Sequence, residues 1–549
     1  MSGLEETYSK TDLEKNSQPV VTFSSENEGN QNLHRGLKGR HVQMISIGGV
    51  IGTGLFLGTA GALRNGGPAG LLIGYSAIGA MCYAVMVSLG EMIAHLPVAG
   101  GHITLARRFV SPALGFAMGW NYWYNWTIVL PAELNAAAVL IGYWNKSVNP
   151  GVWIAICLVV ACAINFGGSR AYGEAEFWFA IIKVITIIGL IILGIIIDCG
   201  GGPNGQFIGT KYWRDPGAFV QYAGIEGATG RFLGVWAVLI QASFSYIGTE
   251  IVAIAAGETK DPRKTLPRAI KNVYIRILLF YILGVFITGL VVPSNDPRLN
   301  LGSGTAASAP FVIAIQNAGI KALPSIINAC LLSSAWSAAS SDLYTSSRAL
   351  YGLALNGQAP AFLKKTNRWG LPWVTVLVGV AFSLLSFMSV GSTSAGKVFG
   401  YFANMTSVCG LLTWSGICLT YIQFHKGLKE QNIDRTLLPY RAPLQPFLAY
   451  FGLIFSCIVL LFNGWSVFLK GNWDSSTFVT SYFPIAFFPV LLCFYRYIWR
   501  RNERGPSPSE MDFVSGSRDE TGLTELDAGD VEASTEGKSM GRKILAYVL

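Results

Sequence analysis

The sequence has 549 residues, of which 13% are charged and 51% are hydrophobic, and it contains 63 glycines. Soluble proteins usually contain about 25% charged residues, so this composition excludes an ordinary soluble enzyme, a coiled coil and a disordered chain. The formal net charge is +9, but the basic residues are not clustered, which argues against nucleic acid as a partner. The composition therefore predicts a polytopic membrane protein in contact with a lipid bilayer.

Apolar runs long enough to cross a hydrocarbon core of about 30 Å recur along the chain. Twelve such runs, separated by polar breaks, predict an all-α fold with 12 transmembrane helices. The predicted spans are residues 43–63, 69–94, 113–142, 150–166, 174–198, 231–256, 270–292, 322–347, 372–391, 396–423, 446–469 and 479–499.

Polar segments flank this apolar region. Residues 1–40 and 501–549 are poor in aromatic residues and rich in Ser, Glu, Asp and Gly, so we expect two disordered tails around one membrane domain at 41–500. Lys and Arg favour cytosolic loops. Sixteen Lys and Arg residues lie in one set of alternate loops, which begins with the loop of Arg107 and Arg108, and nine lie in the intervening loops. With no signal peptide before the first span, this asymmetry predicts that both termini are cytosolic.

The nine cysteines occur singly, without a CxxC motif or a Cys/His ligand spacing. We therefore expect no disulfide framework, no metal site and no cofactor. Asn145-Lys-Ser147 is a glycosylation sequon in a loop predicted to face outside, although its closeness to the membrane disfavours its use.

Two predicted spans are interrupted at matching positions. Gly52, Thr53 and Gly54 place weak helix formers in the middle of the first span. The sixth span contains FSYIGTE at 244–250, in which Ile247-Gly-Thr-Glu250 corresponds to Ile51-Gly-Thr-Gly54. Close packing through small residues is the alternative for a single such span. Two interrupted spans at matching positions favour an inverted-repeat transporter with its site near the membrane midplane. The interruptions leave free N–H and C=O groups, which suit the two charged groups of a zwitterion.

Five motifs resemble those of fungal amino acid permeases of the amino acid-polyamine-organocation superfamily: IGTGLFLGTA, GEMIAHLPVAGG, FSYIGTE, GETKDPRKTLPRAI and SRALYGLALNGQAPAFLKKTNRWGLP. The resemblance covers about residues 35–500. It implies two inverted five-helix repeats (spans 1–5 and 6–10), two extra helices, broken helices 1 and 6, and proton-coupled uptake across the plasma membrane. Tail lysines of similar proteins commonly receive ubiquitin, which makes Lys10 and Lys15 candidates; two solvated lysines are the alternative.

The resemblance places the substrate at the interruption of span one. Thr53 and Gly54 match positions whose backbone amides hold the substrate carboxylate, with Gly52 beside them, and Ile51 offers a carbonyl to the amino group. Phe244 matches an aromatic gate in span six. The same motif adds three candidate substrate-binding residues, Ser245, Tyr246 and Gly248.

Ionisable residues inside spans are functional candidates because burying them is costly. Lys183 lies in span five, and we interpret it as having no acidic residue nearby in the sequence. It resembles a lysine that replaces a coupling sodium and bridges spans one and eight. The alternative is that its long side chain snorkels to the membrane interface. Glu133 in span three, just after Pro131, is a candidate for binding a substrate ammonium, for relaying a proton or for pairing with a neighbour. Glu250 is the third proton-coupling candidate, and hydrogen bonding to free amides at the interruption is its alternative.

Two polar residues are predicted to line the substrate cavity. Asn125 precedes Glu133 by eight residues, about two helical turns, and so lies on a similar face. Thr406 belongs to a polar group in span ten that, by resemblance, faces the substrate side chain.

These features predict a secondary active transporter that imports L-amino acids by proton symport with broad specificity. A basic-amino-acid-selective permease and a nutrient receptor that keeps the same fold are the alternatives. An enzyme is not expected, because the histidines lie at the predicted cytosolic edges without nucleophile, base or metal partners. These histidines are His34, His41, His95, His102 and His425.

Overall fold

The computed structural model describes residues 51–98, 100–145, 147–251, 273–300, 309–367, 370–391, 394–500 and 503–515. The elements in these ranges are all helical, which confirms the predicted all-α class for this part of the chain. The predicted N-terminal tail with Lys10 and Lys15, the first part of span one and residues 252–272 lie outside the described residues.

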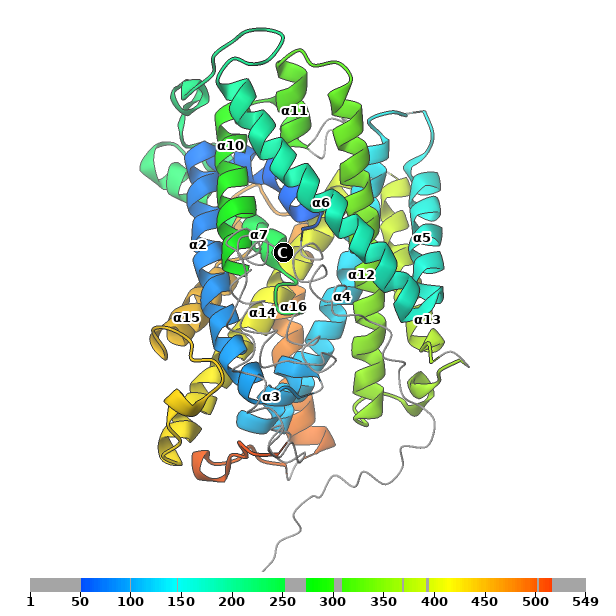
Figure 1. The fold of residues 1–549 in the computed structure, drawn as a ribbon, viewed down its shortest axis with the longest axis vertical. Coiled ribbons are helices and arrows are strands. Elements are labelled where there is room, and N and C mark those ends of the chain that lie inside the picture. Colours follow the sequence, from blue (N-terminus) through cyan, green and yellow to red (C-terminus); the bar gives the residue numbers. More distant parts are fainter. Residues whose placement is uncertain are drawn as a thin grey trace, which may run out of the picture.

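The α-helices keep the labels of Figure 1. They are α2 (Thr59–His95), α3 (Gly101–Phe109), α4 (Pro112–Ile141), α5 (Pro150–Phe166), α6 (Gly168–Asp198), α7 (Gly227–Tyr246), α10 (Leu283–Val291), α11 (Pro310–Asn317), α12 (Leu323–Leu355), α13 (Trp373–Ser383), α14 (Ala395–Glu430), α15 (Phe447–Leu461) and α16 (Ser475–Cys493). Segments of π-helix precede or follow some of them: η1 (Gly54–Gly58), η4 (Ile277–Ile282) and η11 (Phe494–Trp499).

Within the described ranges, seven helical segments are long and apolar enough to cross a membrane. They are Gly54–His95, Ala171–Asp198, Val273–Val291, Trp373–Val390, Ala395–Glu430, Phe447–Phe468 and Ser475–Trp499. The first has 42 residues and would be about 63 Å long if straight, about twice a hydrocarbon core. Gly67 interrupts it with a left-handed φ of 73°, and Pro68 follows, so this segment contains the end of predicted span one and the whole of span two. The chain is a multi-pass membrane protein.

Helix α4 lies in the interior and packs against α12 and α14, while α2 packs against α7. Helix α4 has a well-defined start, because the Ser111 side chain accepts a hydrogen bond from the Leu114 amide and Pro112 occupies the first turn. Figure 1 shows α5, α13 and α15 at the periphery. Large apolar side chains on the outer helices are exposed, such as Val159 on α5 and Ile185 on α6, as a lipid-facing surface requires.

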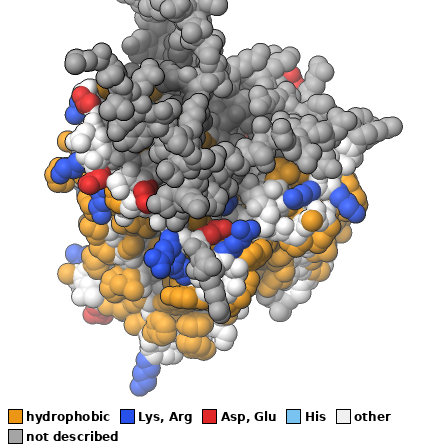
Figure 2. Space-filling view, turned by 90° about the horizontal axis from the view of Figure 1, so that it is seen from below, with side chains coloured by type: hydrophobic (Ala, Val, Ile, Leu, Met, Phe, Trp, Pro, Cys, Tyr) orange, Lys and Arg blue, Asp and Glu red, His pale blue; other side chains and the backbone are white. Residues whose placement is uncertain are grey.

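Residues 503–515 pack against α3 at the lower end of the molecule in Figure 1. Arg108 donates hydrogen bonds of 2.6 Å to the carbonyls of Asp512 and Ser515 and forms a 2.7 Å ion pair with the Asp512 carboxylate. Phe513 is buried against Phe109. The tail predicted to begin at residue 501 therefore starts with a packed segment, and residues 516–549 lie outside the described part. Figure 2, seen from this end, shows Lys and Arg side chains beside broad hydrophobic surface.

Candidate functional site

Two helix ends meet at the candidate site. Ile51 and Gly52 are not helical, and helical structure starts at Thr53 and the π-turn η1. On the other side, α7 ends at Tyr246, and Gly248 has a left-handed φ of 95°. A Cβ atom on Gly54 would lie 2.9 Å from the Ser245 Cα. The two segments that sequence analysis paired are thus in direct contact, and only glycine permits their approach at Gly54.

Residues 51–53, at the start of the first helical segment, contact α4 and α12. The Thr53 hydroxyl donates a 2.7 Å hydrogen bond to Oε1 of Glu133, and both residues are buried. A Cβ on Gly52 would lie 3.7 Å from the same Oε1. Ser334 of α12 donates a 3.3 Å hydrogen bond to the Ile51 carbonyl. This carbonyl is the group that is predicted to bind the amino group of the substrate. This arrangement brings Ile51, Gly52 and Thr53 together with Glu133.

The end of α7 is anchored to α2 by two side chains. The hydroxyls of Ser245 and Tyr75 are 2.8 Å apart, and the Tyr246 hydroxyl donates a 2.9 Å bond to the Tyr75 carbonyl. Tyr246 also stacks on Tyr281 with ring centroids 4.4 Å apart. Ser245 and Tyr246 therefore hold the helix end in position, and their hydroxyls are already engaged within the protein.

Glu250 lies on the far side of the α7 end. Its Oε2 accepts hydrogen bonds of 3.2 Å from the Gly248 amide and from the indole N–H of Trp414 on α14. The carboxylate thus caps the turn that follows α7. This geometry matches the alternative given for Glu250, hydrogen bonding to a free amide at the interruption.

Phe244 lines a pocket of about 650 Å³ that is bordered by α2, α7, α14, α16 and the segment 462–466 that follows α15. Its ring makes an edge-on contact with Phe399 of α14, with centroids 5.7 Å apart, and Phe399 lines the same pocket. Gly54 lies directly behind Phe244, because its Cβ would be 3.0 Å from the Phe244 ring. Phe244 therefore lies between Gly54 and this pocket, in contact with Phe399.

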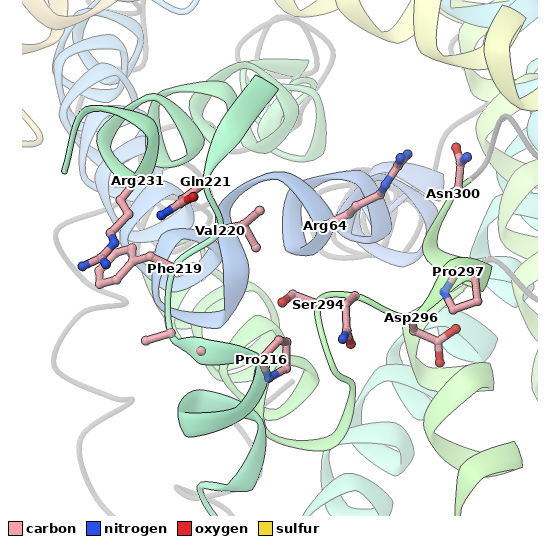
Figure 3. A pocket seen from close by; sticks show the side chains of 13 residues that line it. Arg64, Pro216, Phe219, Val220, Gln221, Arg231, Ser294, Asp296, Pro297 and Asn300 are labelled. Carbon is pink, nitrogen blue, oxygen red and sulfur yellow. The ribbon is translucent and has the colours of Figure 1, made fainter. Parts of the chain in front are cut away.

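Basic side chains surround the approach to this pocket. Arg64 of α2 lines it together with Lys397, and Arg64 also lines a neighbouring pocket of about 920 Å³. Figure 3 shows Arg231 and Asp296 on opposite sides of the second pocket. Burial alone would raise the pKa of Asp296, but the hydrogen bonds and charge of Arg298 outweigh it and lower that pKa. The Asp296 charge is thus balanced locally by Arg298.

Asn125 and Thr406 lie in the interface between α4 and α14. One turn before Asn125, Asn121 donates hydrogen bonds to the Cys409 carbonyl and the Thr413 hydroxyl of α14. Oδ1 of Asn125, Oγ1 of Thr406 and Oε2 of Glu133 are buried and have no hydrogen-bond partner among the described residues. Buried polar atoms are normally hydrogen-bonded, so these three atoms are suited to a polar ligand.

Lys183 has an acidic neighbour, and the interpretation that no acid lies nearby in the sequence is wrong. Its Nζ is 3.7 Å from Oε1 of Glu176, and both side chains are fully buried. Glu176 precedes Lys183 by seven residues, two helical turns, so the spacing itself could have revealed the pair. Lys183 also interacts electrostatically with Glu133.

Three further residues contact the candidate site and were not predicted from the sequence. These are Ser334, which bonds to Ile51; Trp414, which bonds to Glu250; and Phe399, which contacts Phe244. Each lies more than 80 residues from its partner, and no local pattern in the sequence marks the contact. By contrast, Glu91 accepts two hydrogen bonds of 2.8 Å from Arg435, a structural ion pair away from the helix ends.

Comparison with known proteins identifies the family. The family model described as "Amino acid permease" matches residues 41–504. The chain is 45% identical over 477 residues to a dicarboxylic amino acid permease of Saccharomyces cerevisiae, covering 86% of this chain and 78% of that protein. It is 43% identical over 513 residues to a proline-specific permease of Emericella nidulans, covering 92% of each.

A third relative is a lysine-specific permease of Saccharomyces cerevisiae, 42% identical over 477 residues, which covers 86% of this chain and 77% of that protein. All three names describe transporters, so the chain is a permease and not an enzyme. The family match, the membrane-crossing helices and the contact between the two helix ends agree with one another. The chain belongs to the amino acid permease family.

Proposed function

We propose that this amino acid permease is a secondary active transporter that imports L-amino acids across the plasma membrane by proton symport, with broad specificity. Amino acid transport follows from the family. The direction, the coupling ion and the breadth of specificity are the proposed parts. The partners are L-amino acids and protons, and ubiquitin attachment at Lys10 and Lys15 is proposed as the route of down-regulation.

The hydrogen bond between Thr53 and Glu133 carries the proposal. It lies where the start of η1 meets the end of α7, next to backbone groups that have no place in a regular helix. Free amides at a helix start favour a carboxylate, while the Glu133 carboxylate and the Ile51 carbonyl favour an ammonium. A zwitterion can therefore bind with its two charged groups against Thr53–Gly54 and Ile51.

The proposed architecture has 12 spans, with two inverted five-helix repeats at spans 1–5 and 6–10, two extra helices, and breaks in helices 1 and 6. It is supported by the end of α7 at Tyr246, by the left-handed Gly248 and by the contact of this segment with Gly54. Residues 41–500 form the membrane domain, with both termini in the cytosol.

Broad specificity is supported by the relatives. They are named for dicarboxylic amino acids, proline and lysine, at identities between 42% and 45%, so similarity to them favours no single class. Asn125 and Thr406 are neutral polar residues that suit many side chains. The basic-selective alternative depends on Glu133 together with Asn125, and Oε1 of Glu133 already accepts the Thr53 hydrogen bond.

Competition between substrates in a cell that lacks its own amino acid uptake tests the proposal. Uptake of labelled arginine, glutamate and leucine is measured in the presence of each unlabelled amino acid. Broad specificity predicts that each competes with the other two. Uptake of arginine alone would establish the basic-selective permease instead, and binding without uptake of any of the three would indicate a receptor.

A further inference from the structure

Three side chains with exchangeable protons line one face of α6. Tyr172, Glu176 and Lys183 are separated by four and seven residues, which places them on the same side of a helix. All three are buried, although the opposite side of α6 exposes apolar residues such as Ile185 and Ile192. Burying ionisable groups in an apolar span is costly unless they are partnered, so their partners are informative.

The three residues are connected through α12. Lys183 Nζ is 3.7 Å from Glu176 Oε1. The other carboxylate oxygen accepts hydrogen bonds from Ser337 and Ser341, at 2.6 Å and 3.3 Å. The Tyr172 hydroxyl then donates a 3.1 Å bond to Ser341. Hydrogen bonds thus form a continuous path of proton-exchanging groups from Glu176 to Tyr172, which lies one turn after the start of α6 at Gly168. The ion pair places Lys183 next to the other end of this path.

We propose that Glu176 receives the proton that Lys183 releases during transport and passes it toward the Gly168 end of α6. The proposal rests on the proton symport proposed above. In the transfer, an ammonium N–H bond breaks and a carboxyl O–H bond forms, so the ion pair becomes an amine and a carboxylic acid and the net charge stays the same. Release of that proton to water at the helix end restores the carboxylate.

The two serines link this transfer to movement of α12. Their hydrogen bonds hold the Glu176 carboxylate against α12. If α12 shifts relative to α6, these bonds are lost and the carboxylate oxygen becomes available to accept the proton. Proton transfer to Glu176 is thus tied to a change in the contact between two helices.

Other titratable groups lie around Glu176. On α12, Asp342 interacts electrostatically with Glu176, Lys183 and Glu133 of α4, and its Oδ2 has no hydrogen-bond partner in the described ranges. Three carboxyl groups and one ammonium therefore lie within electrostatic reach of one another. Tyr344 stacks on Tyr172, next to Arg348. Helix α5 adds only the thiols of Cys157 and Cys162, and α10 and α11 contain no titratable side chain.

Paired measurements of substrate and proton movement test the proposal. The purified full-length chain is reconstituted in vesicles, and labelled leucine uptake is recorded together with the signal of an internal pH dye. In Glu176→Gln and Lys183→Arg we expect exchange of labelled for unlabelled leucine to continue while leucine-driven proton flux is lost. Arginine does not release its proton, so both variants block the same transfer. Glu430→Gln, at the exposed end of α14, is the matched control and keeps both activities.

The outcomes separate this proposal from proton symport itself. Wild-type uptake without proton movement would overturn symport, and this proposal with it. Proton flux that persists in Glu176→Gln, with a coupled wild type, would overturn only the role of Glu176. Loss of exchange together with proton flux would assign Glu176 a purely structural role and also overturn the proposal.

A second pair of variants keeps the test decisive if Glu176→Gln does not fold. Glu176→Asp retains a carboxyl group and should retain proton flux. The double change Ser337→Ala and Ser341→Ala removes the hydrogen bonds that link the carboxylate to Tyr172, so proton flux should fall while leucine exchange continues. Unchanged proton flux in the double variant, or loss of coupling in Glu176→Asp with exchange intact, would contradict the proposal.

Discussion

The Thr53 hydroxyl donates a 2.7 Å hydrogen bond to the Glu133 carboxylate, 80 residues later in the chain. The bond joins the first helical residue before η1 to the middle of α4. It orients Oε1 of Glu133 toward the helix start and leaves Oε2 without a donor among the described residues. A carboxylate positioned in this way, beside backbone groups outside regular helix, is prepared for the charged ends of an amino acid.

The approach of the two helix ends at Gly54 gives the first prediction. An alanine Cβ at this position would lie 2.9 Å from the Ser245 Cα, and overpacking of this kind costs about 1–3 kcal/mol. Gly54→Ala should therefore reduce uptake of every amino acid by about tenfold or more. At Gly58, four residues later, the nearest atoms would be 4.0 Å away, so Gly58→Ala is the matched control and should transport normally. Loss of a single substrate class in Gly54→Ala would contradict this prediction.

Glu133→Gln tests the role of the carboxylate in recognition. Glutamine can still accept the Thr53 hydrogen bond, so the local structure should persist while the negative charge is removed. A hydrogen bond to a charged group contributes about 1.5–3 kcal/mol. We therefore expect at least about a tenfold weaker apparent affinity for leucine as well as for arginine and lysine in competition assays, because every substrate carries the α-ammonium. Weakening confined to arginine and lysine would mean that Glu133 contacts the side chain instead.

Substrate preference should depend on the α4–α14 interface. Thr406→Val removes a buried hydroxyl that has no partner within the described part of the chain, and Asn125→Ala removes a neighbouring amide. A lost hydrogen bond contributes about 0.5–1.5 kcal/mol, so the ranking of substrates should change by up to about tenfold while maximal uptake is retained. Thr420→Val is the control, because the Thr420 hydroxyl donates its hydrogen bond within its own helix, to the Gly416 carbonyl. A uniform change across substrates would place both residues outside the pocket.

The packed segment at residues 503–515 should loosen in acid. Burial alone would raise the pKa of Asp512, but hydrogen bonds from Ser515 and Val514, with the charge of Arg108, lower it overall. A lowered pKa means that Asp512 stabilises the packed segment at pH values above its unfolded pKa of about 3.9 and that this contribution is lost as the pH falls below it.

Hydrogen exchange of residues 503–515 measures this effect. At pH 7, Asp512→Asn and Arg108→Ala should exchange faster than the wild type, and the difference for Asp512→Asn should shrink below about pH 4. Arg107→Ala, at the adjacent position, is the control and should leave exchange unchanged. Equal protection in all variants at pH 7 would show that the ion pair does not hold the segment.

Much of the helical framework could be predicted from hydropathy. The predicted span 150–166 coincides with α5, and the break predicted in span six is the end of α7 at Tyr246. Helices α12 and α14 extend to Leu355 and Glu430, beyond predicted ends at 347 and 423. Hydropathy marks only the apolar part of a helix, whereas the helix itself continues into the polar region.

The contacts within the site were less predictable than the helices. The pairing of Gly54 with Ser245 could be anticipated because the two motifs resemble each other. The contacts of Phe399 with Phe244 and of Trp414 with Glu250 depend on how helices pack, and no local pattern encodes them. Helix α11 at Pro310–Asn317 was not predicted, since its eight residues are too short for a span.

Accumulation of an amino acid in vesicles that contain only this protein tests proton-coupled transport most directly. Labelled leucine uptake is measured with and without an inward proton gradient, and Thr53→Val serves as the inactive reference. We predict that leucine accumulates above its external concentration only when the gradient is present and leaves the vesicles when a protonophore removes it. Accumulation that is the same with and without the gradient would contradict proton symport by this permease.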